Sequence, residues 1–161
     1  MLKFLNFKQK KANKIFKKAQ ELMNNYKDAN AIILFKKVIK LDPNNSSSYY
    51  NIGLIYKYRL EWNKSLDYNL KAYKLNPEDE AARWNTAIAA TALGKWDIAR
   101  KAWKDQCFDL GEEHGEINSN FGQTPVRLNS ENGEVVWGTR IDPVRVKINN
   151  IPFEDSGYHY E

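Results

Sequence analysis

Few side chains in this sequence could carry out covalent chemistry. The only cysteine, Cys107, is followed seven residues later by His114. A thiolate paired with an imidazole can act as a nucleophile, provided that a third group orients the imidazole and the surroundings lower the pKa of the thiol. No motif around either residue supplies these conditions. We therefore predict no catalytic residue and expect Cys107 to be a small buried residue near a helix end.

Metal and cofactor chemistry is equally poorly supported. One cysteine and two histidines are too few for a cysteine-based zinc site or a histidine-rich metal site. The acids Glu112, Glu113 and Glu116 beside His114 have the pattern of a solvated loop. The glycine-rich motifs that cradle phosphates are absent from the sequence. We predict that the chain is not an enzyme and that it holds neither a cofactor nor a metal.

Two asparagines are better suited to noncovalent recognition. Asn51 and Asn85 lie 34 residues apart, so a chain that repeats with this period presents both in the same way. A side-chain amide carries a donor and an acceptor together and can pair with a peptide group irrespective of sequence. The alternative is that each amide only caps or solvates a helix. The sequence leaves both interpretations open.

Composition narrows the class of protein. The 161 residues are 42% hydrophobic and 13% aromatic, which is enough apolar bulk for a core. No stretch approaches the roughly 20 apolar residues that a membrane-spanning helix needs. The first residues, Met1–Lys8, contain no apolar run of signal-peptide length. We therefore expect a cytoplasmic protein.

The positive charge is concentrated at the N-terminus. Residues 1–40 contain eleven lysines against Glu21 and Asp28, whereas the rest of the chain has a small negative net charge. Such a segment could bind an anionic polymer or a membrane surface, with Phe4 and Phe7 inserting at the interface. It is also typical of a solvated helix face. We do not expect nucleic acid as the partner, because arginine, which usually reads bases and phosphates, is missing from this cluster.

The remaining sequence repeats with a period of 34 residues. Within each period, apolar residues follow helical spacing, as at Tyr49, Ile52, Gly53 and Tyr56. The proline of each period ends a helix, because proline cannot continue a helix interior. Each period therefore predicts two antiparallel helices. The matching positions are Leu41-Asp42-Pro43 with Leu75-Asn76-Pro77, Trp62 with Trp96, and the small residues Ala31, Ser65 and Ala99.

This pattern resembles the tetratricopeptide repeat family over residues 12–111. The second repeat offers Tyr49, Ile52, Gly53, Tyr56, Ser65, Ala72 and Pro77, and it departs from the family at Asn69, where a bulky residue is expected. The first repeat keeps Ala19, Leu22, Ala31, Phe35 and Pro43; the third keeps Ala87, Gly94, Ala99 and Trp103. The resemblance implies a mainly α fold, a solenoid of about three helix-turn-helix repeats whose stacked helices share one core.

The resemblance also implies a binding groove on the concave face, formed by the first helix of each repeat. In this family such grooves bind extended peptides or partner helices. Of the residues that clamp a C-terminal carboxylate in some members, only Asn51 has a counterpart here, so we do not expect a receptor for chaperone tails. The implied groove residues are Phe16, Gln20, Met23, Tyr50, Asn51, Leu54, Lys57, Trp84, Asn85 and Ile88.

A different pattern follows the repeats. Residues 112–123 form a polar connector, and the segments Thr124–Leu128, Glu134–Ile141 and Val144–Ile148 have the alternation of strands. Asn132-Gly133 predicts a two-residue hairpin turn. We expect residues 1–11 to be a basic extension and residues 124–161 a small antiparallel β appendage. The appendage is similar to a segment that follows such repeats in some bacterial proteins. It is too small to bury an adequate core alone, so it must cap the repeats, dimerise or bind something.

These observations favour a cytoplasmic protein–protein interaction module that binds a peptide or helix of a partner in the groove. Two alternatives stay open at this point. One is binding to an anionic polymer or membrane surface through the lysine-rich N-terminus. The other is a small antagonist or immunity-type protein that neutralises a specific partner.

Overall fold

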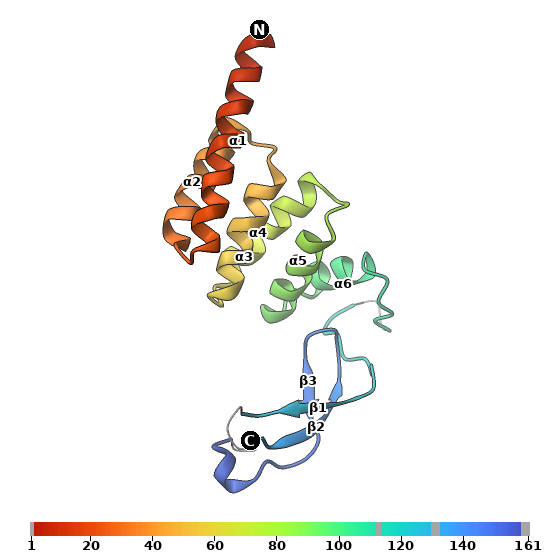
Figure 1. Cartoon of the computed structure of the whole chain (residues 1–161). Helices are drawn as coiled ribbons and strands as arrows, with labels where there is room; N and C mark the ends of the chain where they lie inside the picture. The colour runs from red at the N-terminus through yellow and green to blue at the C-terminus, as the bar shows by residue number, and fades with distance from the viewer. Residues whose placement is uncertain (1, 112–113, 130–132, 159–161) are drawn as a thin grey trace. The chain divides into compact units, whose positions relative to one another are not determined.

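The computed structural model of the chain describes residues 2–111, 114–129 and 133–158. The chain divides into two compact units, Met1–Cys107 and Phe108–Glu161, and each is described by itself. The first unit is helical and the second contains a small sheet, as the sequence predicts (Figure 1).

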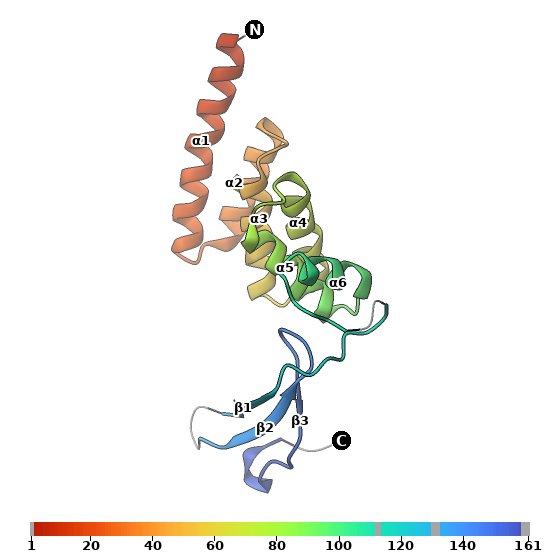
Figure 2. The same ribbon diagram turned by 90° about the vertical axis from the view of Figure 1, so that its right-hand side faces the viewer.

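The helical unit is a solenoid of three antiparallel helix pairs. Figure 2 shows the first helix of each pair on one side of the unit and the second helix on the other. Three or four residues connect successive helices. The helices are α1 (Leu2–Asn24), α2 (Asp28–Leu41), α3 (Ser46–Tyr58), α4 (Trp62–Leu75), α5 (Glu80–Ala92) and α6 (Trp96–Lys104).

The turn inside each pair repeats with the 34-residue period. Tyr26, Leu60 and Gly94 occupy the same place in successive repeats, and all three have φ between 57° and 63°. Only glycine adopts this left-handed conformation without a steric cost, so the two earlier repeats carry backbone strain that Gly94 avoids. The turns between repeats end in helix caps: Asn45 accepts from the Ser48 amide at 2.9 Å, and Asp79 accepts from Ala81 and Ala82 at 3.1 Å.

Small residues allow the helices to approach closely, as the sequence predicts. Ala31, Ser65 and Ala99 are completely buried. The departure at Asn69 is also accommodated in the core: its side chain is fully buried against Gly53, and its amide donates to the Ser65 carbonyl at 2.9 Å. The bulk expected at this position comes instead from Tyr68 on the neighbouring face, which stacks on Tyr56.

The first helix is longer than the repeat requires. Because α1 begins at Leu2, the predicted boundary between an extension (1–11) and the repeats (12–111) falls inside one continuous helix. Lysine has a good helix propensity, and the stretch before Ala12 contains neither glycine nor proline to end the helix. At the other end, α6 has nine residues, and the helical unit ends at Cys107.

The sheet unit contains β1 (Gln123–Arg127), β2 (Val135–Arg140) and β3 (Val146–Ile148), antiparallel and in that order. The predicted two-residue turn at Asn132-Gly133 is wrong. Asn132 lies outside the described residues, but Arg127 pairs with Val135 and the Leu128 amide donates to the Glu134 carbonyl. The connection therefore spans the five residues 129–133. The register is set by packing of Val136, which is completely buried, rather than by the local turn preference.

The predicted turn at Asp142 is confirmed. Its buried carboxylate accepts from the backbone amides of Val144 at 2.8 Å and Arg145 at 2.6 Å. The Arg145 guanidinium bonds the same carboxylate and also reaches Glu116 and the Ile117 carbonyl. This cluster ties the start of the sheet unit to the β2–β3 connection.

Candidate functional site

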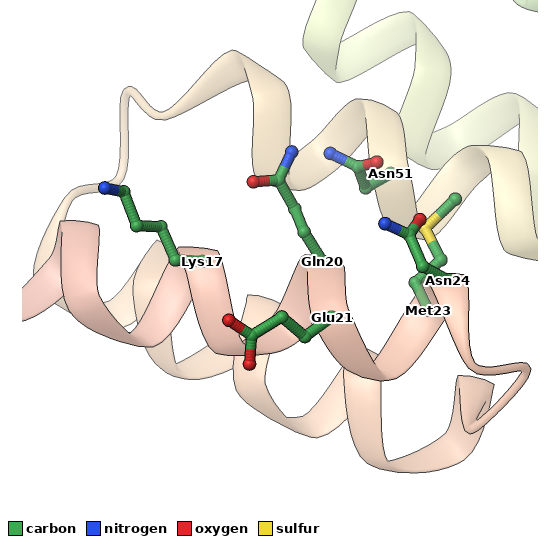
Figure 3. Close-up of a pocket in the computed structure, with 6 residues that line it drawn as sticks. All are labelled: Lys17, Gln20, Glu21, Met23, Asn24 and Asn51. Atoms are coloured by element: carbon green, nitrogen blue, oxygen red, sulfur yellow. The ribbon is translucent and has the colours of Figure 1, made fainter.

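A hollow of about 340 Å³ lies between the first helices of repeats one and two (Figure 3). Gln20 and Asn24 extend from α1 on the side that faces Asn51 of α3, whereas Glu21 points away from Asn51. The hollow thus brings three side-chain amides together on the face where the family groove is expected. Its lining residues are Lys17, Gln20, Glu21, Met23, Asn24 and Asn51.

The two asparagines of the 34-residue period have different surroundings. Asn85 on α5 is 3% exposed, and its Oδ1 accepts from the Lys57 ammonium of α3 at 2.9 Å. Its side chain also hydrogen bonds to Tyr50. Asn51 is half-buried, and its Nδ2 donates to the Ser47 carbonyl one turn earlier in its own helix at 2.7 Å.

The difference has a simple cause in the preceding repeat. Lys57 and Met23 occupy the same repeat position, as do Asn85 and Asn51. Lys57 can donate to Asn85, but the Met23 thioether has no donor to offer Asn51. Asn51 therefore lines the hollow without such a donor from the preceding repeat, whereas the carbonyl oxygen of Asn85 is bound to Lys57.

Burial sets the electrostatics of the second and third repeats at this face. It lowers the pKa of Lys57, because the charged ammonium is partly removed from water. The pKa of Tyr50 is raised, first by burial and then by the nearby charge of Asp79, while the hydrogen bond from Asn85 opposes this shift. Lys57, Asn85 and Tyr50 thus form a polar contact that joins α3 to α5.

The other predicted groove residues contribute mainly to packing. Phe16 packs edge-on against the buried ring of Phe35, with 5.5 Å between centroids. Trp84 is 37% exposed and packs edge-on against the buried Trp103 at 5.0 Å. Leu54 and Ile88 are half-buried on α3 and α5. Of the ten predicted residues, the structure brings Gln20, Met23 and Asn51 together at the hollow.

Sequence reasoning missed three residues of this hollow: Lys17, Glu21 and Asn24. Lys17 and Asn24 each lie about one turn away from Gln20 on α1, so i−3 and i+4 spacing from Gln20 would have found them. None of the three occupies a position at which the family resemblance implies a groove residue.

The expectation that Cys107 is buried is wrong. It is exposed, and its φ of 63° turns the chain out of α6. Among the residues that the structure describes, no group of three or more histidines, cysteines and acids could hold a metal ion. In the same described part of the chain, no helix combines the length and apolar character needed to span a membrane.

The fold and the hollow define the class: an α-helical repeat solenoid with a recess on the face of its first helices. Residues 34–67 match the family model described as tetratricopeptide repeat. The match covers one repeat, about a fifth of the chain, and the three helix pairs form a helical solenoid of the tetratricopeptide repeat type.

Two curated human proteins are similar over part of their length. Tetratricopeptide repeat protein 6 of Homo sapiens is 37% identical over 76 residues, which are 47% of this chain and 13% of that protein. Protein O-mannosyl-transferase TMTC3 of Homo sapiens is 27% identical over 106 residues, 64% of this chain and 12% of that protein. The chain therefore spans about an eighth of the length of these relatives.

Solved structures share the fold at lower identity. The second repeat domain of Spaghetti (RPAP3), bound to the HSP90 peptide SRMEEVD, has a TM-score of 0.59 and 19% identity, covering 65% of this chain and 90% of that domain. MamA has a TM-score of 0.55 and 22% identity, covering 60% of this chain and 56% of that chain. At these identities the likeness establishes the solenoid fold.

Proposed function

We propose that this protein is a cytoplasmic protein–protein interaction module that binds an extended peptide of a partner across the first helices of its repeats. The observation that carries the proposal is the set of three amides, Gln20, Asn24 and Asn51, around the hollow between α1 and α3. Side-chain amides pair with peptide groups through a donor and an acceptor. The volume of about 340 Å³ lies at the lower end of the range for small ligand sites, which suits one or two residues of a peptide.

Peptide complexes of similar folds support peptide binding. The Spaghetti repeat domains were solved with an HSP90 peptide, and a repeat domain of yeast Sti1 was solved in a complex with Hsp70. The lining here differs from a clamp for a C-terminal carboxylate, because its only positive charge is that of Lys17, which Glu21 on the same helix balances. We therefore propose recognition of the peptide backbone rather than of a carboxylate tail.

The test uses peptides selected on the full chain from a random peptide display library. Replacing Gln20 and Asn51 by alanine is expected to weaken binding of the selected peptides about tenfold or more, because each lost hydrogen bond contributes about 1 kcal/mol. Dissociation constants from isothermal titration calorimetry measure the effect. Asn30→Ala on α2 is the matched control, since this exposed asparagine lies on a second helix.

A second variant gives the Asn51 amide a hydrogen-bond donor instead of removing the amide. Met23→Lys copies the relationship of Lys57 to Asn85 and places an ammonium where it can donate to Asn51. It is expected to abolish peptide binding while the helical circular dichroism stays unchanged. Selected peptides that bind this variant and the double alanine variant as tightly as the native chain would refute recognition by these amides.

A further inference from the structure

A second hollow, of about 350 Å³, lies among α4, α5 and α6. Its wall is mostly carbon, with Leu70 and Tyr73 from α4 and Ile98 from α6, and the fully buried Thr86 of α5 completes it. It shares no residue with the hollow between α1 and α3.

One residue of this wall is smaller than its counterpart in the preceding repeat. Thr86 occupies the repeat position held by Ile52 in the preceding repeat, and both side chains are completely buried. Threonine has a hydroxyl where isoleucine has an ethyl group, so it fills less of the space between helices. The Thr86 hydroxyl donates to the Ala82 carbonyl of its own helix at 2.8 Å, so it is already satisfied and the hollow keeps an apolar wall.

The second helices around this hollow carry more lysines than acids, although Asp105, which follows α6, accepts a hydrogen bond from the hydroxyl of the wall residue Tyr73. Lys74 and Lys101 stand at its rim, with Asp97 as the one acid among its lining residues. The second helices, α2, α4 and α6, contain three acids in all: Asp28, Asp67 and Asp97. Against these, they expose eight lysines: Lys36, Lys37, Lys40, Lys64, Lys71, Lys74, Lys101 and Lys104.

We propose that this hollow is a second docking site, which takes a bulky apolar side chain of an acidic partner segment. The apolar wall buries the anchoring side chain, and the lysines of the second helices attract the acids on either side of it. The site is independent of the proposed groove. A partner can therefore engage both faces of the solenoid.

The probe is a short fluorescent peptide of aspartate and glutamate with one central phenylalanine, measured by fluorescence polarisation on the full chain. The same peptide with a central alanine is expected to bind about tenfold more weakly, since it loses the burial of one large apolar side chain. This comparison needs no variant protein. Equal affinity for the two peptides, or no binding of the phenylalanine peptide, would overturn the proposal.

Two substitutions at Thr86 form a matched pair. Thr86→Ile fills the hollow with the residue of the preceding repeat and is expected to weaken binding of the phenylalanine peptide about tenfold. Thr86→Val has nearly the volume of threonine and is expected to leave binding unchanged. A folded Thr86→Ile chain that binds as tightly as the native chain would show that the peptide does not occupy the hollow.

Charge reversal tests the rim. Lys74→Glu with Lys101→Glu is expected to weaken binding by more than Lys36→Glu with Lys37→Glu on α2, although both pairs change the net charge equally. Equal losses would reduce the interaction to nonspecific attraction and contradict a site at the hollow. The double variant Gln20→Ala with Asn51→Ala is the control for the hollow between α1 and α3. It is expected to bind the phenylalanine peptide as the native chain does, and a loss of binding would also contradict the proposal.

Discussion

Lys57 on α3 donates a hydrogen bond of 2.9 Å to the amide oxygen of Asn85 on α5, and this bond links the first helices of the second and third repeats. Asn85 is 3% exposed, so the bond lies at the edge of the core rather than in free solvent. The same repeat positions in the preceding pair hold Met23 and Asn51, which cannot form it. Because the second repeat has lysine where the first has methionine, Asn85 is held in a contact between repeats, whereas Asn51 bonds only within its own helix and lines a hollow.

Removal of the Asn85 amide is expected to destabilise the helical unit. Asn85→Leu leaves the partly buried Lys57 ammonium without this acceptor, which costs about 1–3 kcal/mol of unfolding free energy. The double variant with Lys57→Met removes both partners and is expected to recover most of the loss. Urea unfolding followed by circular dichroism measures both. A double variant as unstable as the single one would contradict the coupling.

The lowered pKa of Lys57 makes a prediction about pH. Burial disfavours the charged form in the folded state, so Lys57 opposes folding at pH values below its lowered pKa. This penalty disappears as the pH rises through that pKa towards the ordinary value of 10.5. The native chain is therefore expected to gain stability relative to Lys57→Met over this rise. A constant difference between the two unfolding free energies would refute it.

Tyr73 is expected to titrate late. Burial, the hydrogen bond from its hydroxyl to Asp105 and the charge of that carboxylate raise its pKa from 10.0 to about 12. The interaction therefore stabilises the fold fully below pH 10.0, and the stabilisation is lost as the pH rises towards 12. Asp105→Asn is expected to lower the pKa of Tyr73. Ultraviolet titration of the phenolates, with Tyr73→Phe to assign the late component, measures the change.

Gly53 is expected to tolerate no side chain. A Cβ at this helical position would lie 2.5 Å from the Asn69 amide nitrogen, so Gly53→Ala forces the buried helices apart. The expected loss is about 1–3 kcal/mol despite the better helix propensity of alanine. Asn69→Ala provides the missing space, and the double variant is expected to lose less than Gly53→Ala alone in thermal unfolding. Independent, additive effects would show that the two residues do not compete for one space.

The sheet unit is expected to depend on Asp142. Its buried carboxylate holds two backbone amides and the Arg145 guanidinium. Asp142→Asn loses the charge and part of the acceptor set, at a cost of about 2 kcal/mol. Hydrogen exchange monitored by mass spectrometry is expected to rise in residues 133–158 and to stay unchanged in α1–α6. Unchanged exchange in the sheet unit would contradict this role.

Several features of the fold could be predicted because they repeat or depend on neighbouring residues. The small residues Ala31, Ser65 and Ala99 predicted where the helices pack closely, since the same residue type recurs at the same place in three repeats. The hairpin at Asn132-Gly133 was mispredicted because a local turn preference was weaker than the burial of Val136, which fixed the strand register. Cys107 was misplaced for a related reason: its exposure depends on the left-handed turn that ends α6.

The sequence by itself determined the period, the helix pairs and the face on which Asn51 and Asn85 lie, because helical spacing within a repeat is a local property of the chain. Only the tertiary structure decided which of the two amides is bound by the preceding repeat, because that depends on the side chain that this repeat places opposite it. The Lys57 ammonium donates a hydrogen bond to the Asn85 amide oxygen, whereas Met23 has no donor for Asn51, which lines a hollow. The contact between Lys57 and Asn85 joins residues 28 positions apart, so no local sequence pattern predicts it.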